Sequence, residues 1–325
     1  MIKKKIAALL TAFMVAMGSM QITANAAITP EILGDVNADG SIDASDALYA
    51  LRASVGLQMI TEEEFCRADI NYDGKVNSFD SLAILRMSVS LLDSSVTIGK
   101  PFRYVRPVDG IDVSFWQEDI DFEKVKQSGI NFVILRAGGA TDNPAENHPK
   151  IDPRRQGVDA YFEENYAKAK AAGLNVGVYW YSFAENAEQA QAEAESCLRA
   201  IEGKQFEYPI FYDLENLYQF EKGIDFCSEL METFCSTIRE NGYYAAFYMS
   251  TYFATNYLNS DIKSNYDCWL AQWSGDVNYK GEYVMWQYSV GTVDGIIGDV
   301  DVDYSYVDYP LYIKSLGLNN WSEPQ

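Results

Sequence analysis

From residue 108 onward, short apolar and aromatic-rich stretches alternate with segments whose apolar residues recur at helical spacing. Such alternation is typical of parallel strands joined by crossover helices. The strand-like stretches begin near Gly110, Phe132, Val176, Ile210, Ala245, Cys268, Met285 and Asp299. Eight strands in this arrangement predict a barrel.

The spacing of these strands predicts that the barrel is irregular. A strand with its crossover helix needs about 30 residues, whereas the last three intervals are 23, 17 and 14 residues long. Amphipathic helices are expected at 122–128, 156–172, 187–202 and 224–241. We therefore expect the α/β class: an irregular (β/α) TIM-like barrel over residues 108–315, with eight strands and fewer helices.

Residues 33–93 follow a different pattern, an acidic turn that runs into a helix and occurs twice. The segment 35–46, DVNADGSIDASD, recurs 34 residues later at 69–80 as DINYDGKVNSFD. Each has oxygen ligands at positions 1, 3, 5, 9 and 12, a glycine at 6 and a backbone carbonyl at 7, as a twelve-residue calcium loop requires. The predicted ligands of two structural Ca²⁺ ions are Asp35, Asn37, Asp39, Ser41, Asp43 and Asp46, then Asp69, Asn71, Asp73, Lys75, Asn77 and Asp80.

The repeat resembles the dockerin modules of cellulosomal enzymes, because each loop leads into a helix, at 47–55 and 81–91, and ends on aspartate. The resemblance implies a small all-α calcium-binding module with two EF-hand-like loops that binds a cohesin domain of a scaffold protein. It also implies that Ala44, Ser45, Ser78 and Phe79 influence partner choice. The alternative is a free-standing calcium-stabilised domain, and residues 94–107 form the linker.

The N-terminus predicts export. Lys3, Lys4 and Lys5 precede an apolar run that ends near residue 17, and Ala24 and Ala26 supply small residues for signal peptidase. We expect a signal peptide over residues 1–26 and a secreted, extracellular chain, associated with the cell surface or a cellulosome. No later stretch approaches the ~20 apolar residues of a membrane span.

The composition limits the kinds of catalysis and the classes of partner that this chain can have. A single histidine, His148, leaves little room for Ser-His-Asp or Cys-His catalysis. Acidic residues number 47 against 25 basic ones, and a net charge of −22 disfavours nucleic acid as a partner. Five cysteines without framework-like spacing are interpreted mostly as small buried hydrophobes.

Candidate catalytic residues are acids at strand ends, because barrel active sites form at the C-terminal ends of the strands. These are Asp112, Asp213, Glu215 and Asp301. Asp213 and Glu215 are two residues apart on one strand, so they point to the same face with Cα atoms about 6.6 Å apart. Paired carboxylates of unequal pKa cleave glycosidic bonds. The alternative is that these acids cap loops or bind backbone amides.

Aromatic rings lie on or beside the same strands, where they could stack on sugars. The candidates for substrate binding are Tyr179, Tyr181, Tyr248, Trp273 and Trp286. For any one ring, core packing is the ordinary alternative.

The barrel segment resembles glycoside hydrolase family 25 across nearly all of residues 108–312. The resemblance rests on GIDVSFWQ at 110–117, FVILR at 132–136, AGLNVGVYWY at 172–181, YDLE at 212–215, WLAQW at 269–273, WQY at 286–288 and VD at 300–301. It implies a lysozyme that cleaves the β-1,4 bond between N-acetylmuramic acid and N-acetylglucosamine in peptidoglycan, without a cofactor for catalysis. Glu215 is then the general acid, Asp213 stabilises the intermediate, and Asp112 and Asp301 complete the cluster. The resemblance implies asparagine where this chain has Asp303.

Two questions stay open at this point. Asp213 either attacks the sugar or orients the substrate's acetamido group as nucleophile, and we favour the second, retaining route. Alternative functions are a chitinase-like or other N-acetylhexosaminidase and a non-catalytic glycan-binding anchor. The chitinase signature would place aspartates where this chain has Tyr208 and Phe211.

Overall fold

The computed structural model describes residues 32–96, 100–140, 157–273 and 275–322. The predicted signal peptide and His148 lie outside these ranges. Within them, no helix is both long and apolar enough to cross a bilayer. Four of the five cysteines are buried and Cys66 is exposed, which agrees with their interpretation as mostly small hydrophobes.

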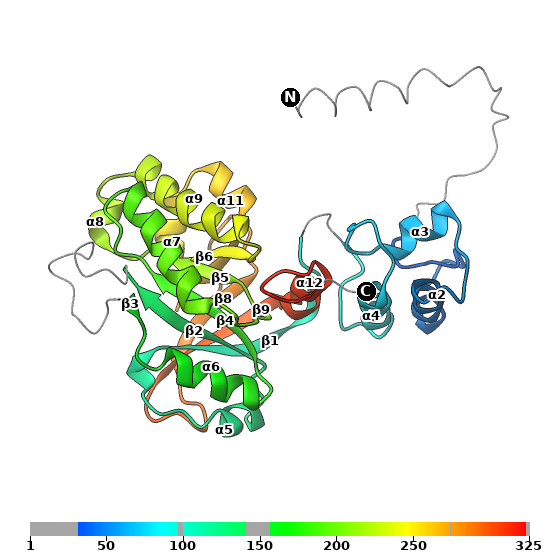
Figure 1. The fold of residues 1–325 in the computed structure, drawn as a ribbon, viewed down its shortest axis with the longest axis horizontal. Helices are drawn as coiled ribbons and strands as arrows, with labels where there is room; N and C mark the ends of the chain where they lie inside the picture. Colours follow the sequence, from blue (N-terminus) through cyan, green and yellow to red (C-terminus); the bar gives the residue numbers. More distant parts are fainter. Residues whose placement is uncertain (1–31, 97–99, 141–156, 274, 323–325) are drawn as a thin grey trace, which may run out of the picture. The chain divides into compact units, whose positions relative to one another are not determined.

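Eight strands close into a barrel, which confirms the predicted fold (Figure 1). In chain order they are β1 Arg103–Val113, β2 Phe132–Gly139, β4 Asn175–Tyr181, β5 Ile210–Asp213, β6 Ala245–Ser250, β7 Asp267–Ala271, β8 Met285–Gly291 and β9 Val300–Val307. Hydrogen bonding runs β1-β9-β8-β7-β6-β5-β4-β2, and β1 pairs with β2 to close the ring.

The last strand departs from the expected parallel order. β9 is antiparallel to both β8 and β1, whereas the other neighbouring barrel strands are parallel. A parallel return needs a crossover of a dozen or more residues, and only residues 292–299 separate β8 from β9. The expected parallel pattern therefore holds for the barrel except at β9.

The helices follow the expected distribution. α5 Phe122–Gln127, α6 Phe162–Ala171, α7 Ala187–Ile201 and α9 Ile224–Glu240 are the predicted helices, and shorter ones are η1 Phe115–Gln117, α8 Leu217–Phe220, α10 Thr251–Asn256, α11 Ser260–Asn265 and α12 Tyr309–Ser315. Figure 1 shows α5 and α6 together on one side of the barrel, with α7, α8, α9 and α11 grouped on another. No helix occurs in the described residues between β7 and β9.

The second helix begins later than its pattern predicts. Residues 157–158 form a short strand, β3, that pairs with the end of β2. The Asp159 carboxylate then accepts a hydrogen bond from the backbone N–H of Tyr161 at 2.9 Å. Because this turn occupies the chain, α6 starts at Phe162 rather than at residue 156.

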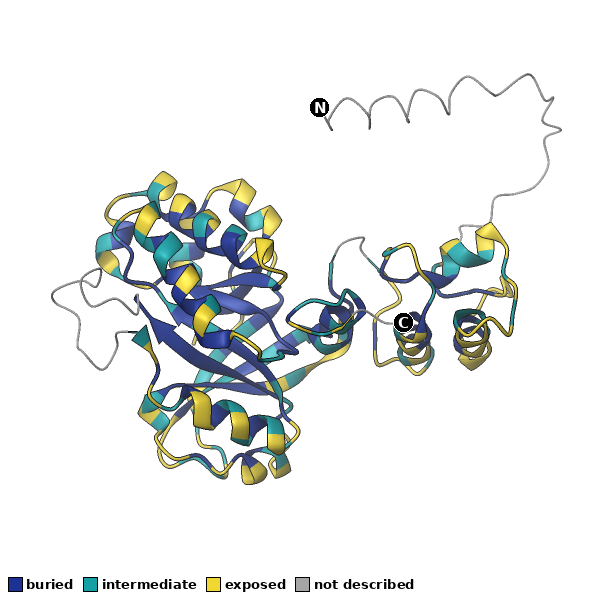
Figure 2. Cartoon of the chain, viewed as in Figure 1, coloured by how far each residue is buried: buried dark blue, intermediate teal, exposed yellow. Residues whose placement is uncertain are grey.

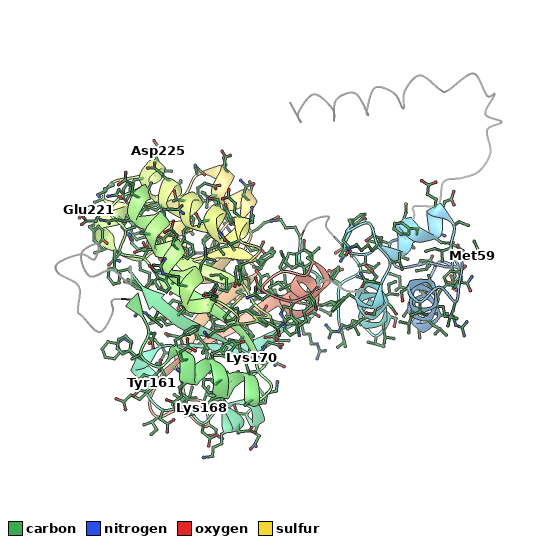
Figure 3. The ribbon with its side chains drawn as sticks, viewed as in Figure 1. Met59, Tyr161, Lys168, Lys170, Glu221 and Asp225 are labelled. Atoms are coloured by element: carbon green, nitrogen blue, oxygen red, sulfur yellow. The ribbon has the colours of Figure 1, made fainter. Side chains whose placement is uncertain are left out.

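Side chains alternate along each strand, so they pack in two cores, one between the strands and the helices and one inside the barrel. On β5, Ile210 and Tyr212 pack among the helices, whereas Phe211 points into the barrel with the rings of Phe132 and Trp269. The strands are buried between helices whose outer faces are exposed (Figure 2). Charged side chains such as Lys168, Glu221 and Asp225 lie on those outer faces (Figure 3). The same alternation directs residues 213 and 215 toward the barrel interior.

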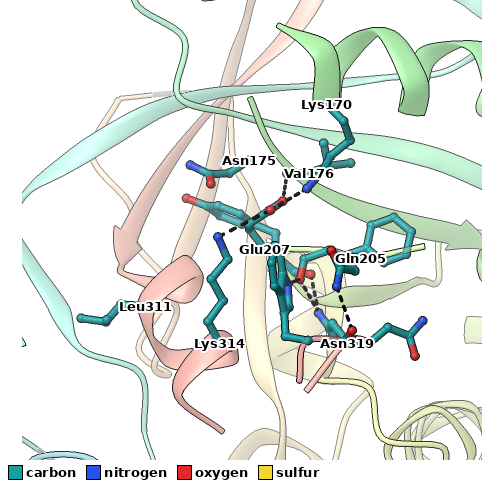
Figure 4. A network of polar contacts seen from close by, with 12 residues as sticks. Lys170, Asn175, Val176, Gln205, Glu207, Leu311, Lys314 and Asn319 are labelled. Carbon is teal, nitrogen blue, oxygen red and sulfur yellow. Dashed lines mark hydrogen bonds and ion pairs between the residues drawn. The ribbon is translucent and has the colours of Figure 1, made fainter. Parts of the chain in front are cut away.

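The N-terminal end of the barrel is closed by polar contacts around Glu207, which precedes β5 (Figure 4). Its carboxylate pairs with Lys170 at 2.5 Å and Lys314 at 3.7 Å, and accepts the backbone N–H of Val176 at 3.1 Å. Asn319 donates to the Tyr208 carbonyl at 2.9 Å. These contacts tie the segment after α12 to the strands, at the end opposite the strand-end acids.

The repeat module contains α2 Ala44–Ser54, α3 Glu62–Ala68 and α4 Ser78–Ser88. The helices α2 and α4 begin three residues earlier than expected, because Asp43 and Asn77 cap them from within the loops. Asp46 and Asp80 complete both capping boxes through the backbone N–H of the capping residue. Helix α3, capped by Thr61, was not predicted.

The loops have the turn geometry and donor chemistry of calcium sites. Asp35 accepts hydrogen bonds from the backbone of Asp39 and Gly40, and Asp69 does the same in the second loop. Gly40 has φ +93° and Gly74 φ +81°, a conformation that glycine adopts without strain. In the described residues no three His, Cys, Asp or Glu side chains converge as a metal group. The all-oxygen donor set around each turn nevertheless fits Ca²⁺.

Candidate active site

The strand-end acids meet at one end of the barrel. Asp112 lies near the end of β1, and Asp213 ends β5, with Glu215 two residues beyond. Asp301 lies near the beginning of β9, opposite Asp112 in the register. Because β9 is antiparallel, its beginning lies at the same end of the barrel as the ends of the parallel strands. The reversed strand thus delivers the fourth acid.

A cavity of about 270 Å³ opens among these residues. Its lining is polar and aromatic: Asp112, Ser114, Trp116, Arg136, Tyr179, Tyr181, Asp213, Glu215, Tyr248, Trp269, Gln287 and Asp301. All four predicted catalytic acids therefore contribute to one concave surface.

Asp213 and Glu215 differ in depth within this cavity. Asp213 is only 4% exposed, and its Oδ1 has no hydrogen-bond partner among the described residues. Glu215 is exposed at the mouth. A buried acceptor without a donor is costly, so Asp213 Oδ1 is available to an N–H group that enters the cavity.

Burial and mutual repulsion raise the pKa values of this carboxyl cluster. Burial raises the pKa of Asp213 well above its usual value, the Glu215 charge adds to the rise, and Arg136 opposes it. Desolvation by the surrounding protein and the charge of Asp301 raise the pKa of Glu215, whereas a hydrogen bond with Tyr248 and the charge of Arg136 lower it. A carboxyl with a raised pKa keeps a proton that it can donate near neutral pH.

Arg136 is the cation that lines the cavity. It lies on β2, is buried, and stacks between the rings of Phe115 and Tyr181 at 5.7 and 5.2 Å. Its Nε donates to the Gly138 carbonyl at 3.4 Å, and Nη2 has no partner among the described residues. This guanidinium favours the anionic forms of both Asp213 and Glu215.

A hydrogen-bonded chain reaches Asp112 through Gln287 of β8. Gln287 donates from Nε2 to Asp112 Oδ2 at 2.8 Å. Its Oε1 accepts from the Tyr248 hydroxyl at 2.9 Å and from the indole N–H of Trp273 at 3.0 Å. An indole N–H can only donate, so Trp273 fixes which end of the amide faces Asp112.

The predicted aromatic residues separate into three groups. Tyr179, Tyr181 and Tyr248 line the cavity. Trp273 lies beside it, 59% exposed and tied to Gln287. The structure does not bring Trp286 to the cavity: it points to the opposite face of β8 from Gln287, and its indole donates to the Gln272 carbonyl at 2.9 Å.

Several cavity residues received no role from the sequence. Trp116, 58% exposed, lines the mouth from η1, and Arg136 and Gln287 supply the polar contacts described above. All three belong to motifs that carried the family resemblance. Strand parity is the signal that could have found Arg136, because alternation places it on the same face of β2 as Phe132 and Ile134, which pack inside the barrel.

Sequence comparison matches two families. The description "Glycosyl hydrolases family 25" matches residues 111–296, and "Dockerin type I domain" matches residues 33–87. An autolytic lysozyme of Clostridium acetobutylicum is 30% identical over 196 residues, which cover 60% of this chain and 54% of that protein. The chain therefore spans about half the length of this relative.

Solved structures share the barrel. The CTP1L endolysin superposes with a TM-score of 0.52 and 25% identity, over 64% of this chain and 70% of its own. The bacterial lysozyme of Streptomyces coelicolor gives a TM-score of 0.52 at 21% identity, over 67% of this chain and 100% of its own. The second likeness supports the fold alone.

Proposed function

Because the chain belongs to glycosyl hydrolases family 25, we propose that it is a secreted hydrolase of peptidoglycan. It cleaves the β-1,4 bond between N-acetylmuramic acid and N-acetylglucosamine. The observation that carries the proposal is the convergence of Asp112, Asp213, Glu215 and Asp301 in one aromatic-lined cavity at the end of this barrel. A relative named as a lysozyme supports the choice of substrate.

Glu215 is the general acid in this proposal. Its position at the cavity mouth lets it reach a glycosidic oxygen, and its raised pKa keeps the proton needed by the leaving group. The Tyr248 hydroxyl, which donates to Gln287, lies within hydrogen-bonding reach of this carboxyl. The chain has one histidine, so a carboxylic acid is the natural donor.

Asp213 acts from the buried side of the same strand face. Its unpartnered Oδ1 is suited to accept the N–H of the substrate's 2-acetamido group. That hydrogen bond would turn the acetamido oxygen toward the anomeric carbon and stabilise the positive charge that develops in the transition state. The charge of Arg136 opposes the rise that burial gives to the pKa of Asp213 and so favours its anion. The proposed reaction is substrate-assisted and retains the anomeric configuration.

Aromatic rings complete the glycan site. Tyr179, Tyr181 and Tyr248 contact the sugar within the cavity, and the exposed rings of Trp116 and Trp273 provide stacking surfaces at its rim. Trp273 is also bonded to the Gln287 amide that holds Asp112. A glycan bound at the rim would therefore lie next to the hydrogen bonds that orient Asp112.

The product identifies the bond that is cut. Purified peptidoglycan digested with the protein and reduced with borohydride should yield muramitol, because cleavage leaves N-acetylmuramic acid at the reducing end. Undigested wall reduced in parallel gives the background. Glucosaminitol as the main product would replace the lysozyme assignment with a glucosaminidase, and no new reducing end would favour a glycan-binding anchor.

The repeat module attaches the enzyme to a cohesin domain in this proposal. It matches the dockerin type I description. Its helices α2 and α4 leave apolar side chains on the surface, among them Leu48, Leu51, Leu82 and Leu85. Exposed apolar patches of this kind are typical of protein-binding surfaces. Two Ca²⁺ ions, held by the twelve predicted loop residues, would neutralise the acidic residues of each loop.

Calcium removal should loosen residues 33–93 and leave the barrel folded, because every predicted metal ligand belongs to the module. Hydrogen exchange of the full chain in EGTA should show rapid exchange in α2 and α4, with β4–β7 still protected. Excess Ca²⁺ should restore the module, and excess Mg²⁺ serves as the matched control. Loss of protection in both segments together would contradict the assignment of the ions to the module.

A further inference from the structure

Asp303 is a buried carboxyl beyond the cavity lining. It lies on β9, opposite Gly110 of β1, and its exposed fraction is 0%. A Cβ added at Gly110 would meet the Phe132 ring at 2.1 Å. The absence of a side chain at residue 110 leaves Asp112 as the neighbour of Asp303 on that face of β1.

The two oxygens of Asp303 have different partners. Oδ1 accepts the indole N–H of Trp269 at 2.8 Å. Oδ2 meets no N–H or hydroxyl donor among the described residues, and the Asp303 side chain lies within hydrogen-bonding reach of the Asp112 carboxyl. Two carboxylates cannot hydrogen-bond to each other, because both only accept. The contact requires a proton on one of them.

The other contacts decide which oxygen of Asp303 can take part. Asp112 Oδ2 accepts from Gln287 Nε2, whose orientation Trp273 fixes. Gln287 lowers the pKa of Asp112 and Trp269 lowers that of Asp303, whereas burial raises both. Because Asp303 Oδ1 accepts from Trp269, Oδ2 is the oxygen left to share a proton with Asp112.

We propose that Asp112 and Asp303 Oδ2 share one proton, and that Asp303 is thereby a positioning residue for Asp112 in the cavity. This proposal rests on the proposed function only in its activity test. Asp303 does not line the cavity, and it acts by holding Asp112 in place with a hydrogen bond.

The surrounding charges agree with a retained proton. Asp301 on β9 raises the pKa of both carboxyls, and Asp213 on β5 acts on Asp112. Tyr208 and Tyr248 face the pair as neutral hydroxyls with pKa values above 10. The largest cause of the raised pKa of Asp303 is its burial. Loss of the proton at alkaline pH would place two anions in contact, and Asp112 would move.

An activity profile tests the positioning role. Asp303→Asn supplies a permanent N–H to Asp112, so it should keep at least about a third of wild-type kcat/KM, with the alkaline limb moved up by about one pH unit or more. Asp303→Leu should lose about 10-fold or more at every pH. Asp267→Asn, a buried carboxyl at the other end of the barrel, is the matched control and should leave the limb unmoved. An unmoved limb in Asp303→Asn would overturn the positioning role.

Stability tests the shared proton without any substrate. The folded state holds this proton to a higher pH than the unfolded chain, where an aspartate titrates near about 4, so the wild-type free energy of unfolding should fall as pH rises above that value. Asp303→Asn removes this contribution. The Tm of Asp303→Asn relative to wild type should therefore increase steadily from pH 5 to pH 9, whereas that of Asp267→Asn should not. If the Tm difference between Asp303→Asn and wild type does not change with pH, the shared proton is overturned, even if the protein proves to be a lysozyme. If the Tm difference rises with pH but the protein has no activity, only the proposed function is overturned.

Discussion

Glu215→Gln is expected to lower the rate of peptidoglycan hydrolysis about 10²-fold or more. Glutamine keeps the shape and polarity of the side chain but removes the proton that the leaving group needs. No histidine lies in the described cavity to replace it. Release of reducing sugar from purified wall measures the loss, and pull-down with insoluble wall should show that glycan binding persists.

The matched control is Glu221→Gln. Glu221 is an exposed glutamate at the end of α8, and it does not line the cavity (Figure 3). Its activity should equal that of the wild type. In wild type, activity should fall as pH rises through the raised pKa of Glu215, because the donor is then lost. Full activity in Glu215→Gln would show that another group is the acid.

Asp213→Asn is expected to reduce kcat by about 10²-fold with a much smaller change in KM. The asparagine removes the charge that steadies the transition state, and it can present a donor where the acetamido N–H needs an acceptor. Steady-state kinetics on soluble glycan fragments separate the two constants. Asp225→Asn, an exposed aspartate in the first turn of α9, is the control.

A second measurement on the wild type distinguishes the two roles of Asp213. If the acetamido group is the nucleophile, a fragment whose sugar lacks that group should not be cleaved although it binds. If Asp213 attacks the anomeric carbon, the same fragment should be cleaved and should leave a glycosyl ester on Asp213. Detection of that ester by mass spectrometry would overturn the substrate-assisted route.

Local pattern determined most of the barrel. The predicted starts of β2, β5, β6 and β8 coincide with the observed ones, because a buried strand is a run of apolar and aromatic residues bounded by turns. The period of two along β5 also placed Asp213 and Glu215 on one face before any tertiary contact was known. The match to family 25 confirms the resemblance that these motifs carried.

Other features depended on contacts between distant segments. The direction of β9 follows from the short connection at 292–299 together with its pairing to β1, and a strand pattern contains no direction. Trp286 was predicted to bind substrate from its aromatic character alone, which does not show which face of β8 the ring occupies. Because Trp286 is adjacent to Gln287 on the strand, it lies on the opposite face from the cavity. Similarly, residues 157–158 fall within a predicted helix, but they form β3 and pair with β2.

The sequence by itself thus determined which residues form strands, which loops carry the ligand pattern of calcium sites and which acids lie at strand ends, because these depend on local order along the chain. Only the tertiary structure decided the environment of those acids. The Gln287 amide, the Arg136 Nη2 that has no partner among the described residues, and the Asp112–Asp303 contact arise where β1, β2, β8 and β9 converge. Hydrogen bonding and burial, which set the protonation of a carboxyl, are properties of that convergence and not of any one segment.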